Sequence, residues 1–189
     1  MTDIARTDDI FFTRTGMEPD RVTRHVGDAL DGSDDGELFL EYSQSESITF
    51  DDGRVRNASF DTTQGFGLRA VSGEATGYAH STELSEAAII RAGETVRAVR
   101  TGQGGTVGEP PANTNRDLYT DTNPLGEMAF EDKVKLLAEI DAYARDSDTR
   151  VRQVTASLGG SWQAVQILRA DGDRRADIRP LVRLNVSVM

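Results

Sequence analysis

The sequence predicts an α+β protein, because its hydrophobic periodicity switches between two values along the chain. Apolar residues spaced three and four apart predict helices over 19–30, 84–100 and 129–145. Between and after these helices, apolar residues alternate with polar ones, which is typical of half-buried strands. The predicted architecture is an antiparallel sheet of about six strands with three helices packed on it. The sheet could be open, a half-barrel or two helix-plus-meander repeats.

Each predicted helix has one apolar face. The first begins at Pro19, a residue suited to the first helical turn. The residues expected to face the core are Val22, Val26, Ala29 and Leu30; Ile89, Ala92, Gly93, Val96 and Val99; and Phe130, Val134, Leu137, Ile140 and Ala144. Residues 1–15 have no firm periodicity, so we expect a loose N-terminus before a single domain over 16–189. Residues 101–123 are rich in Gly, Pro, Asn and Thr, which predicts a long loop.

The strands fall into two regions of similar order. Even-numbered apolar positions over 38–50 predict the first strand, and Asp51-Asp52-Gly53 predicts the hairpin turn that follows it. In the second region, turns are expected at Gly159-Gly160 and at Asp171-Gly172. The remaining predicted strands are 54–61, 65–71 and 75–80 in the first region, and 151–158, 161–169 and 174–188 in the second. The similar order suggests an internal duplication.

The charge and composition exclude several kinds of partner and site. The formal net charge of −11 argues against nucleic acid and anionic membranes, since both are polyanions. There is no cysteine, which excludes disulfides and thiolate metal ligands. An acidic chain with only two lysines is typical of adaptation to high salt, although an ordinary acidic protein fits as well. No apolar run approaches the ~18 residues that a membrane span needs, and no signal-peptide core is present, so we expect a cytoplasmic protein.

Two motifs imitate ligand sites without the surroundings that such sites need. The run from Gly65 to Ala70 fits G-x-G-x-x-A, but Gly73 and Gly77 follow where a phosphate-binding helix should begin. The acidic segment at 31–36 resembles the start of a calcium loop, but Tyr42 stands where a bidentate Glu is required. We therefore expect a bulged strand and a solvated loop.

The sequence offers no metal site and no catalytic residue. Its two histidines, His25 and His80, lie far apart, and neither belongs to an H-E-x-x-H motif. A zinc site needs about three converging protein ligands. No pair of carboxylates is singled out by its spacing as an acid/base couple.

The most informative segment is 64–80, where Gly65, Gly67, Gly73 and Gly77 lie among strand-forming residues. Glycine inside a strand costs stability, so it usually marks a bulge, a turn or a close backbone approach. This segment resembles the N-terminal half of the TldD/PmbA family of metalloproteases, in its TldD version. The similarity continues through 81–85 into the second helix and returns at 130–137 and 162–169, so that it covers about 37–189.

The resemblance implies a zinc peptidase that acts on unfolded or short peptides and often works as a homo- or hetero-dimer of related subunits. In that family the zinc ligands come from an H-E-x-x-x-H helix and a distant cysteine, beyond the part that this chain resembles. Neither is present here, so we expect zinc only in the full-length protein and no activity from this chain alone. Its last strand ends without a cap, which suggests that the polypeptide continues into the metal-binding domain.

The resemblance leaves this chain a role in assembly and in positioning the substrate. A peptide held as an extended strand along a sheet edge would suit a β-rich domain. Arg69, Tyr78 and His80 are the candidate groove residues, although Arg69 could instead pair with a carboxylate. The alternatives are a non-catalytic interaction module, such as the metal-free partner subunit of the same family, and a free-standing α+β domain.

Overall fold

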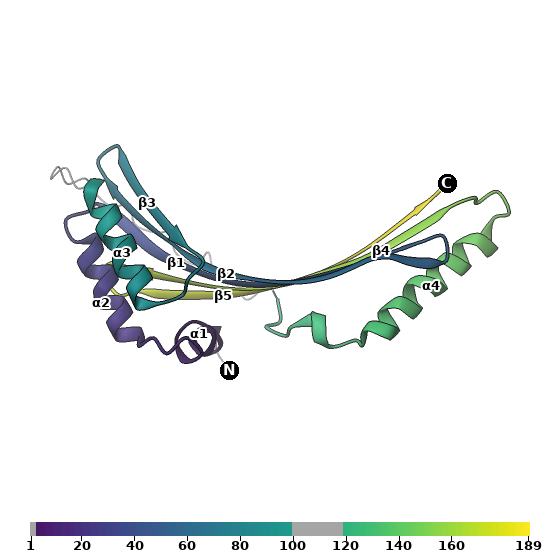
Figure 1. Cartoon of the computed structure of the whole chain (residues 1–189), viewed down its shortest axis with the longest axis horizontal. Coiled ribbons are helices and arrows are strands. Elements are labelled where there is room, and N and C mark those ends of the chain that lie inside the picture. Colours follow the sequence, from purple (N-terminus) through teal and green to yellow (C-terminus); the bar gives the residue numbers. More distant parts are fainter. Residues whose placement is uncertain (1–2, 100–118) are drawn as a thin grey trace. The chain divides into compact units, whose positions relative to one another are not determined.

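The computed structural model describes residues 3–99 and 119–189 and contains one five-stranded antiparallel sheet with the strand order β3-β2-β1-β4-β5 (Figure 1). The α+β prediction is confirmed, and the two β regions join in one sheet because β1 lies beside β4. The strands are β1 (Asp35–Asp51), β2 (Arg54–Ser72), β3 (Ala75–Ser81), β4 (Val154–Arg169) and β5 (Arg174–Val188). The helices are α1 (Asp3–Asp8), the π-helical η1 (Asp9–Thr13), α2 (Pro19–Leu30), α3 (Glu86–Val96), α4 (Phe130–Ser147) and two 3₁₀ turns, η2 (Arg97–Val99) and η3 (Pro124–Gly126).

The strands are fewer and longer than predicted. β2 joins the two strands expected at 54–61 and 65–71, and β4 joins those expected at 151–158 and 161–169. The turn predicted at Gly159-Gly160 is therefore wrong. A Cβ on Gly160 would lie 2.6 Å from Leu125 Cδ2, so this glycine lets Leu125 approach the strand instead of reversing the chain.

The three predicted helices are present, and two of them have shifted ends. The first matches α2 at both ends, and the third matches α4, which runs two residues further. The second is shorter than expected at both ends: Ser85 caps the start of α3 by accepting a hydrogen bond from the Ala88 amide at 3.1 Å, and α3 ends at Val96, where the 3₁₀ turn η2 begins. Residues 101–118 of the predicted long loop lie outside the described residues.

The prediction of a loose N-terminus is wrong for residues 3–13, which form α1 and η1. Ile10, Phe11 and Phe12 are buried, with exposed fractions of 5%, 0% and 2%. The Arg174 guanidinium lies over the Phe12 ring, 5.2 Å from its centroid. The three apolar residues are consecutive in a π-helical segment, so they leave no 3.6-residue pattern for the sequence analysis to detect.

The chain divides into two compact units, and each unit contains residues from β1, β2, β4 and β5. In the first unit, whose described residues are 3–42, 63–99 and 164–178, α2 and α3 pack together and α3 contacts β3. A Cβ on Gly93 of α3 would lie 3.0 Å from the Ala29 Cβ of α2, which indicates a close helix contact. The largest side chains of this core include Phe11, Leu30, Leu38, Leu40, Leu68, Ile89 and Leu168.

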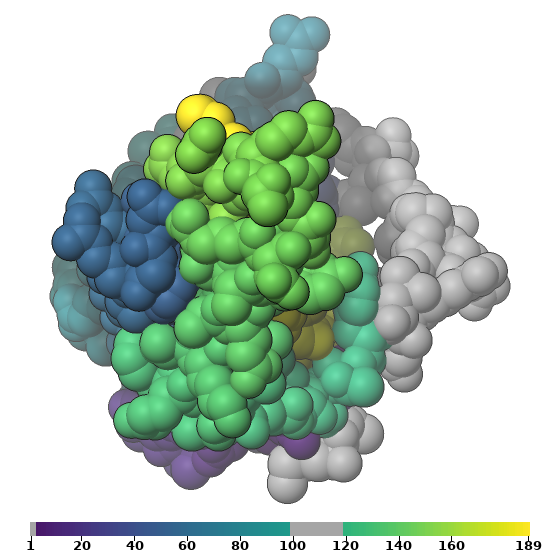
Figure 2. Space-filling model, turned by 90° about the vertical axis from the view of Figure 1, so that its right-hand side faces the viewer, coloured from purple at the N-terminus to yellow at the C-terminus, as the bar shows by residue number. Residues whose placement is uncertain are grey.

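The second unit comprises residues 43–62, 119–163 and 179–189, among those described. Its core contains Ile48 and Phe50 of β1, Leu137 of α4 and Ala156 of β4. Figure 2 shows α4 in green on the surface of this unit, with the β1–β2 turn in blue beside it.

The alternation predicted for the last strand is present, but most of it is not buried. Ile178 is 3% exposed, whereas Val182, Leu184, Val186 and Val188 are 46–57% exposed. β5 is an edge strand of the sheet, so its apolar row has a neighbouring strand on one side only.

Within residues 3–99 and 119–189, no helix combines the length and the apolar character that crossing a lipid bilayer requires.

Candidate substrate-contact surface on β2 and β3

The β2–β3 hairpin brings the three predicted groove residues together. Arg69 pairs with Tyr78, and Gly67 pairs with His80, in the antiparallel register of the two strands. Residues directly opposite each other share a face, and so do residues two apart on one strand. Arg69, Tyr78 and His80 therefore lie on one face of the hairpin, and β3 is an edge strand of the sheet.

Tyr78 and His80 form an exposed aromatic pair. Tyr78 is 62% exposed, and His80 is also exposed. Their ring centroids are 5.7 Å apart at an interplanar angle of 27°, which is a stacked arrangement. An exposed stack of this kind presents both an apolar face and polar atoms at the surface.

Arg69 is engaged by carboxylates of β1. Its Nε donates to Glu37 Oε1 at 2.7 Å, and its Nη2 donates to Glu37 Oε2 and Asp35 Oδ2, both at 2.8 Å. The hydrogen bond to Glu37, together with the charges of Glu37 and Asp35, raises the pKa of Arg69. Arg169 also pairs with Asp35, at 3.1 Å. The carboxylate pairing weighed in the sequence analysis is thus present, and a contact of Arg69 with substrate stays a prediction.

The four glycines of the motif have different surroundings. A Cβ on Gly65 would lie 2.7 Å from the Ser81 carbonyl oxygen, so only glycine fits this close approach. Gly73 forms the β2–β3 turn with a φ of +59°, and its amide donates to Asp34 Oδ2 at 2.6 Å. A Cβ on Gly67 would lie 3.0 Å from the Tyr78 ring, and Gly77 is buried opposite Ala70.

The ion pairs of Arg69 predict a dependence of stability on acid pH. Burial acts to raise the pKa of Asp35, but hydrogen bonds from Arg69 and the Gly36 amide, with the nearby arginine charges, bring it below its ordinary value of 3.8. A carboxyl group with a lowered folded-state pKa stabilises the fold above the unfolded pKa, and this contribution is lost as the pH falls through the folded value.

We therefore expect Asp35→Asn to lower the free energy of unfolding at pH 7 and to have progressively less effect as the pH falls below the ordinary pKa of 3.8. Urea denaturation of both proteins at a series of pH values measures the difference. Glu74→Gln, at the exposed end of the same hairpin, controls for the loss of one negative charge. An equal destabilisation by Asp35→Asn at every pH would contradict the prediction.

The second unit contains a largely buried ion pair that was not predicted from the sequence. Lys133 of α4 donates to Glu46 Oε1 of β1 and to the Leu125 carbonyl oxygen, both at 2.7 Å. The two side chains are only 7% and 17% exposed. Lys133 lies four residues before Leu137 on the buried face of α4, and this spacing was the available signal.

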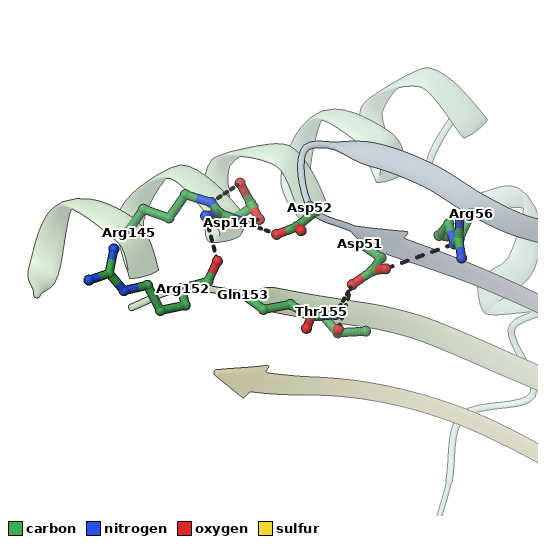
Figure 3. Close-up of polar contacts among 8 residues, drawn as sticks. All are labelled: Asp51, Asp52, Arg56, Asp141, Arg145, Arg152, Gln153 and Thr155. Atoms are coloured by element: carbon green, nitrogen blue, oxygen red, sulfur yellow. Dashed lines mark hydrogen bonds and ion pairs between the residues drawn. The ribbon is translucent and has the colours of Figure 1, made fainter. Parts of the chain in front are cut away.

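A second polar cluster joins the C-terminal part of α4 to the β1–β2 turn (Figure 3). Arg145 pairs with Asp52 and with Asp141, whose Oδ2 lies 3.1 Å from Arg145 Nε. Asp51 accepts hydrogen bonds from Gln153 and Thr155, which hold its pKa below the usual range. This cluster ties a helix to two strands, and its groups satisfy one another, so we assign it a structural role.

The described residues do not fit a zinc site. No group of three or more His, Cys, Asp or Glu residues that could hold a metal ion occurs in residues 3–99 and 119–189. His25 lies on α2 and His80 on β3. We therefore assign no step of a metal-dependent reaction to these residues.

Comparison with known proteins identifies the family over most of the chain. Residues 36–100 match the family model of PmbA/TldA metallopeptidase domain 1, and residues 123–189 match that of the PmbA/TldA metallopeptidase central domain. The chain is 38% identical over 159 residues to a metalloprotease TldD homolog of Haemophilus influenzae and 31% identical over 157 residues to one of Buchnera aphidicola. These matches cover 82% of the chain, and it spans about a third of the length of those relatives (33% and 32%).

Solved structures share the fold at low sequence identity. A protein described as a modulator of DNA gyrase, from Bacteroides thetaiotaomicron, has a TM-score of 0.70 at 14% identity; the match covers 89% of this chain and 40% of that one. TldE from Thermococcus kodakarensis has a TM-score of 0.62 at 15% identity; the match covers 85% of this chain and 41% of TldE. The two family models, in order along the chain, and the TldD relatives lead to one conclusion: the chain belongs to the PmbA/TldD metallopeptidase family.

Proposed function

We propose that this chain forms the N-terminal, peptide-positioning part of a TldD-like zinc metalloprotease that cleaves unfolded or short peptides. The observation that carries the proposal is the exposed Tyr78–His80 stack on edge strand β3. An edge strand offers unpaired backbone N–H and C=O groups to an extended peptide, and side chains beside the edge add selectivity. In this proposal the zinc and its ligands belong to another part of the full-length protein, which pairs with a second PmbA/TldD-like subunit.

The relatives found by sequence comparison support the TldD-type assignment. The relatives at 38% and 31% identity are both TldD homologs, whereas the likeness to TldE is a likeness of fold at 15% identity. The 189-residue chain should show no peptidase activity of its own, and EDTA-sensitive cleavage of casein by the purified chain would contradict this.

Replacing both aromatic residues should weaken peptide binding about tenfold, since aromatic contacts contribute about 0.5–1.5 kcal/mol each beyond the area they bury. The measurement is fluorescence anisotropy of a labelled, unfolded casein peptide with the wild-type chain and with the Tyr78→Ala/His80→Ala variant. Thr76→Ala is the matched control, because Thr76 is exposed on the same face of β3. Equal affinity of the double variant and the control would rule out the β2–β3 surface as the peptide contact.

A further inference from the structure

The second unit contains a pocket that shares no lining residue with the β2–β3 surface. Its volume is about 430 Å³, within the range of small-ligand pockets. Its apolar lining includes Leu125 and Met128, which precede α4, together with Leu136 of α4, Leu158 of β4 and Val182 of β5. An occupant therefore needs an apolar body.

The charged residues of the pocket are Lys133, Glu46 and Glu127. An ammonium group has three N–H donors, and among the described residues the contacts with Glu46 and with the Leu125 carbonyl use two of them. Glu46 accepts the hydrogen bond from Lys133 on Oε1, so its second oxygen can accept another hydrogen bond. The pocket wall thus offers one donor beside one acceptor, which matches the C=O and N–H of a peptide amide.

The charge balance favours a neutral ligand over an acid. Two carboxylates and one ammonium line the pocket, and the ammonium is already paired with one of the carboxylates. A fatty acid or another anion would bring a further negative charge next to Glu46 and Glu127 without a free cation to balance it. A neutral amide meets no such repulsion.

The position of Val182 places the pocket beside a sheet edge. Val182 lies on β5, an edge strand in the order of the sheet, and is 57% exposed. An amide held by Glu46 of β1 lies two strand spacings, roughly 10 Å, from β5, so the occupant enters the pocket past Val182 and does not add to the edge strand. We propose that this pocket binds a leucine-sized apolar side chain of a short peptide, with its amide held by Lys133 and Glu46.

The test uses the full 189-residue chain with ¹³C-labelled Leu and Val methyl groups, titrated with N-acetyl-leucinamide. We expect saturable shifts of the methyl signals of Leu136, Leu158 and Val182, with a millimolar Kd, ordinary for so small a ligand. N-acetylglycinamide, which lacks the apolar side chain, and sodium octanoate, which is anionic, should cause no saturable shift at these methyls.

Val182→Asp should weaken the binding at least about tenfold, because it places a charge in the apolar pocket wall. Val186→Asp is the matched control, since Val186 is 47% exposed on the same face of β5 but does not line the pocket. It should change the Kd by less than about twofold. Tyr78→Ala/His80→Ala should leave this binding unchanged, so that failure here is distinguishable from failure of the β2–β3 proposal.

Three results of the ligand titrations would overturn the inference. They are an absence of saturable shifts up to 50 mM amide, equal binding of octanoate, which would indicate a lipid-type site, and equal weakening by both β5 variants. Pocket methyl shifts that depend on protein concentration alone would instead identify a second copy of the chain as the occupant, and would also overturn it.

Discussion

Replacing Lys133 with methionine is expected to lower the free energy of unfolding of the second unit by about 3–5 kcal/mol. The substitution leaves the Glu46 carboxylate, which is only 17% exposed, without its cation and the Leu125 carbonyl without its donor. Removing one partner of a buried ion pair costs this much because the remaining charge stays out of water. Trp162 is the only tryptophan and lies in this unit, so its fluorescence during urea denaturation reports the relevant transition.

The second lysine of the chain provides a matched control. Lys135 lies two residues further along α4, and its side chain is 75% exposed. Its Nζ lies 3.9 Å from Glu139 Oε1. Lys135→Met should change the free energy of unfolding by less than about 0.5 kcal/mol, as for other exposed pairs on helices. Adding Glu46→Gln to Lys133→Met should restore part of the lost stability, because no buried charge then remains unpaired. Equal effects of the two single lysine variants would contradict the buried pair.

Replacing Phe11 with alanine is expected to destabilise the first unit by about 3–5 kcal/mol, the usual cost of removing a buried phenylalanine ring. Phe11 is fully buried in η1, within the N-terminal segment that the sequence analysis expected to be loose. If this segment were loose, the Phe11 ring would contribute little to the free energy of unfolding. Urea denaturation followed by far-UV circular dichroism, with hydrogen exchange of the α2 amides, measures the effect.

Phe60→Ala is the control for loss of an aromatic ring. Phe60 lies on β2 and is 56% exposed, so its replacement should change the free energy of unfolding by about 0.5 kcal/mol or less. Unchanged protection of the α2 amides in Phe11→Ala would show that η1 contributes nothing to the first core.

The elements with long amphipathic patterns could be predicted from the sequence. α2 and α4 follow from their 3.6-residue spacing, and β1 follows from its alternation, because each of these elements buries one face. The Asp52-Gly53 turn was equally predictable, because Asp-Gly is a preferred pair for hairpin turns that need positive φ at both central residues. Both residues have positive φ in the structure. The length of β2 and β4 was not predictable, because glycine inside a strand and glycine in a turn look the same in one sequence.

The candidate surface was predictable only in part. The sequence singled out Arg69, Tyr78 and His80 by their place in the glycine-rich segment, and the hairpin register then brought them onto one face. That Arg69 is held by Asp35 and Glu37 depends on which strand lies next to β2, and no local pattern contains this information.

The sequence by itself determined the fold class, the absence of thiol chemistry and the family resemblance, because these depend on composition, periodicity and short motifs. The tertiary structure alone decided which polar residues are buried together. Lys133 and Glu46 are 87 residues apart, and the pocket that they border also needs Leu158 and Val182 from two further strands. Contacts between distant segments arise from strand pairing and helix packing, so a local reading of the chain could not reveal them.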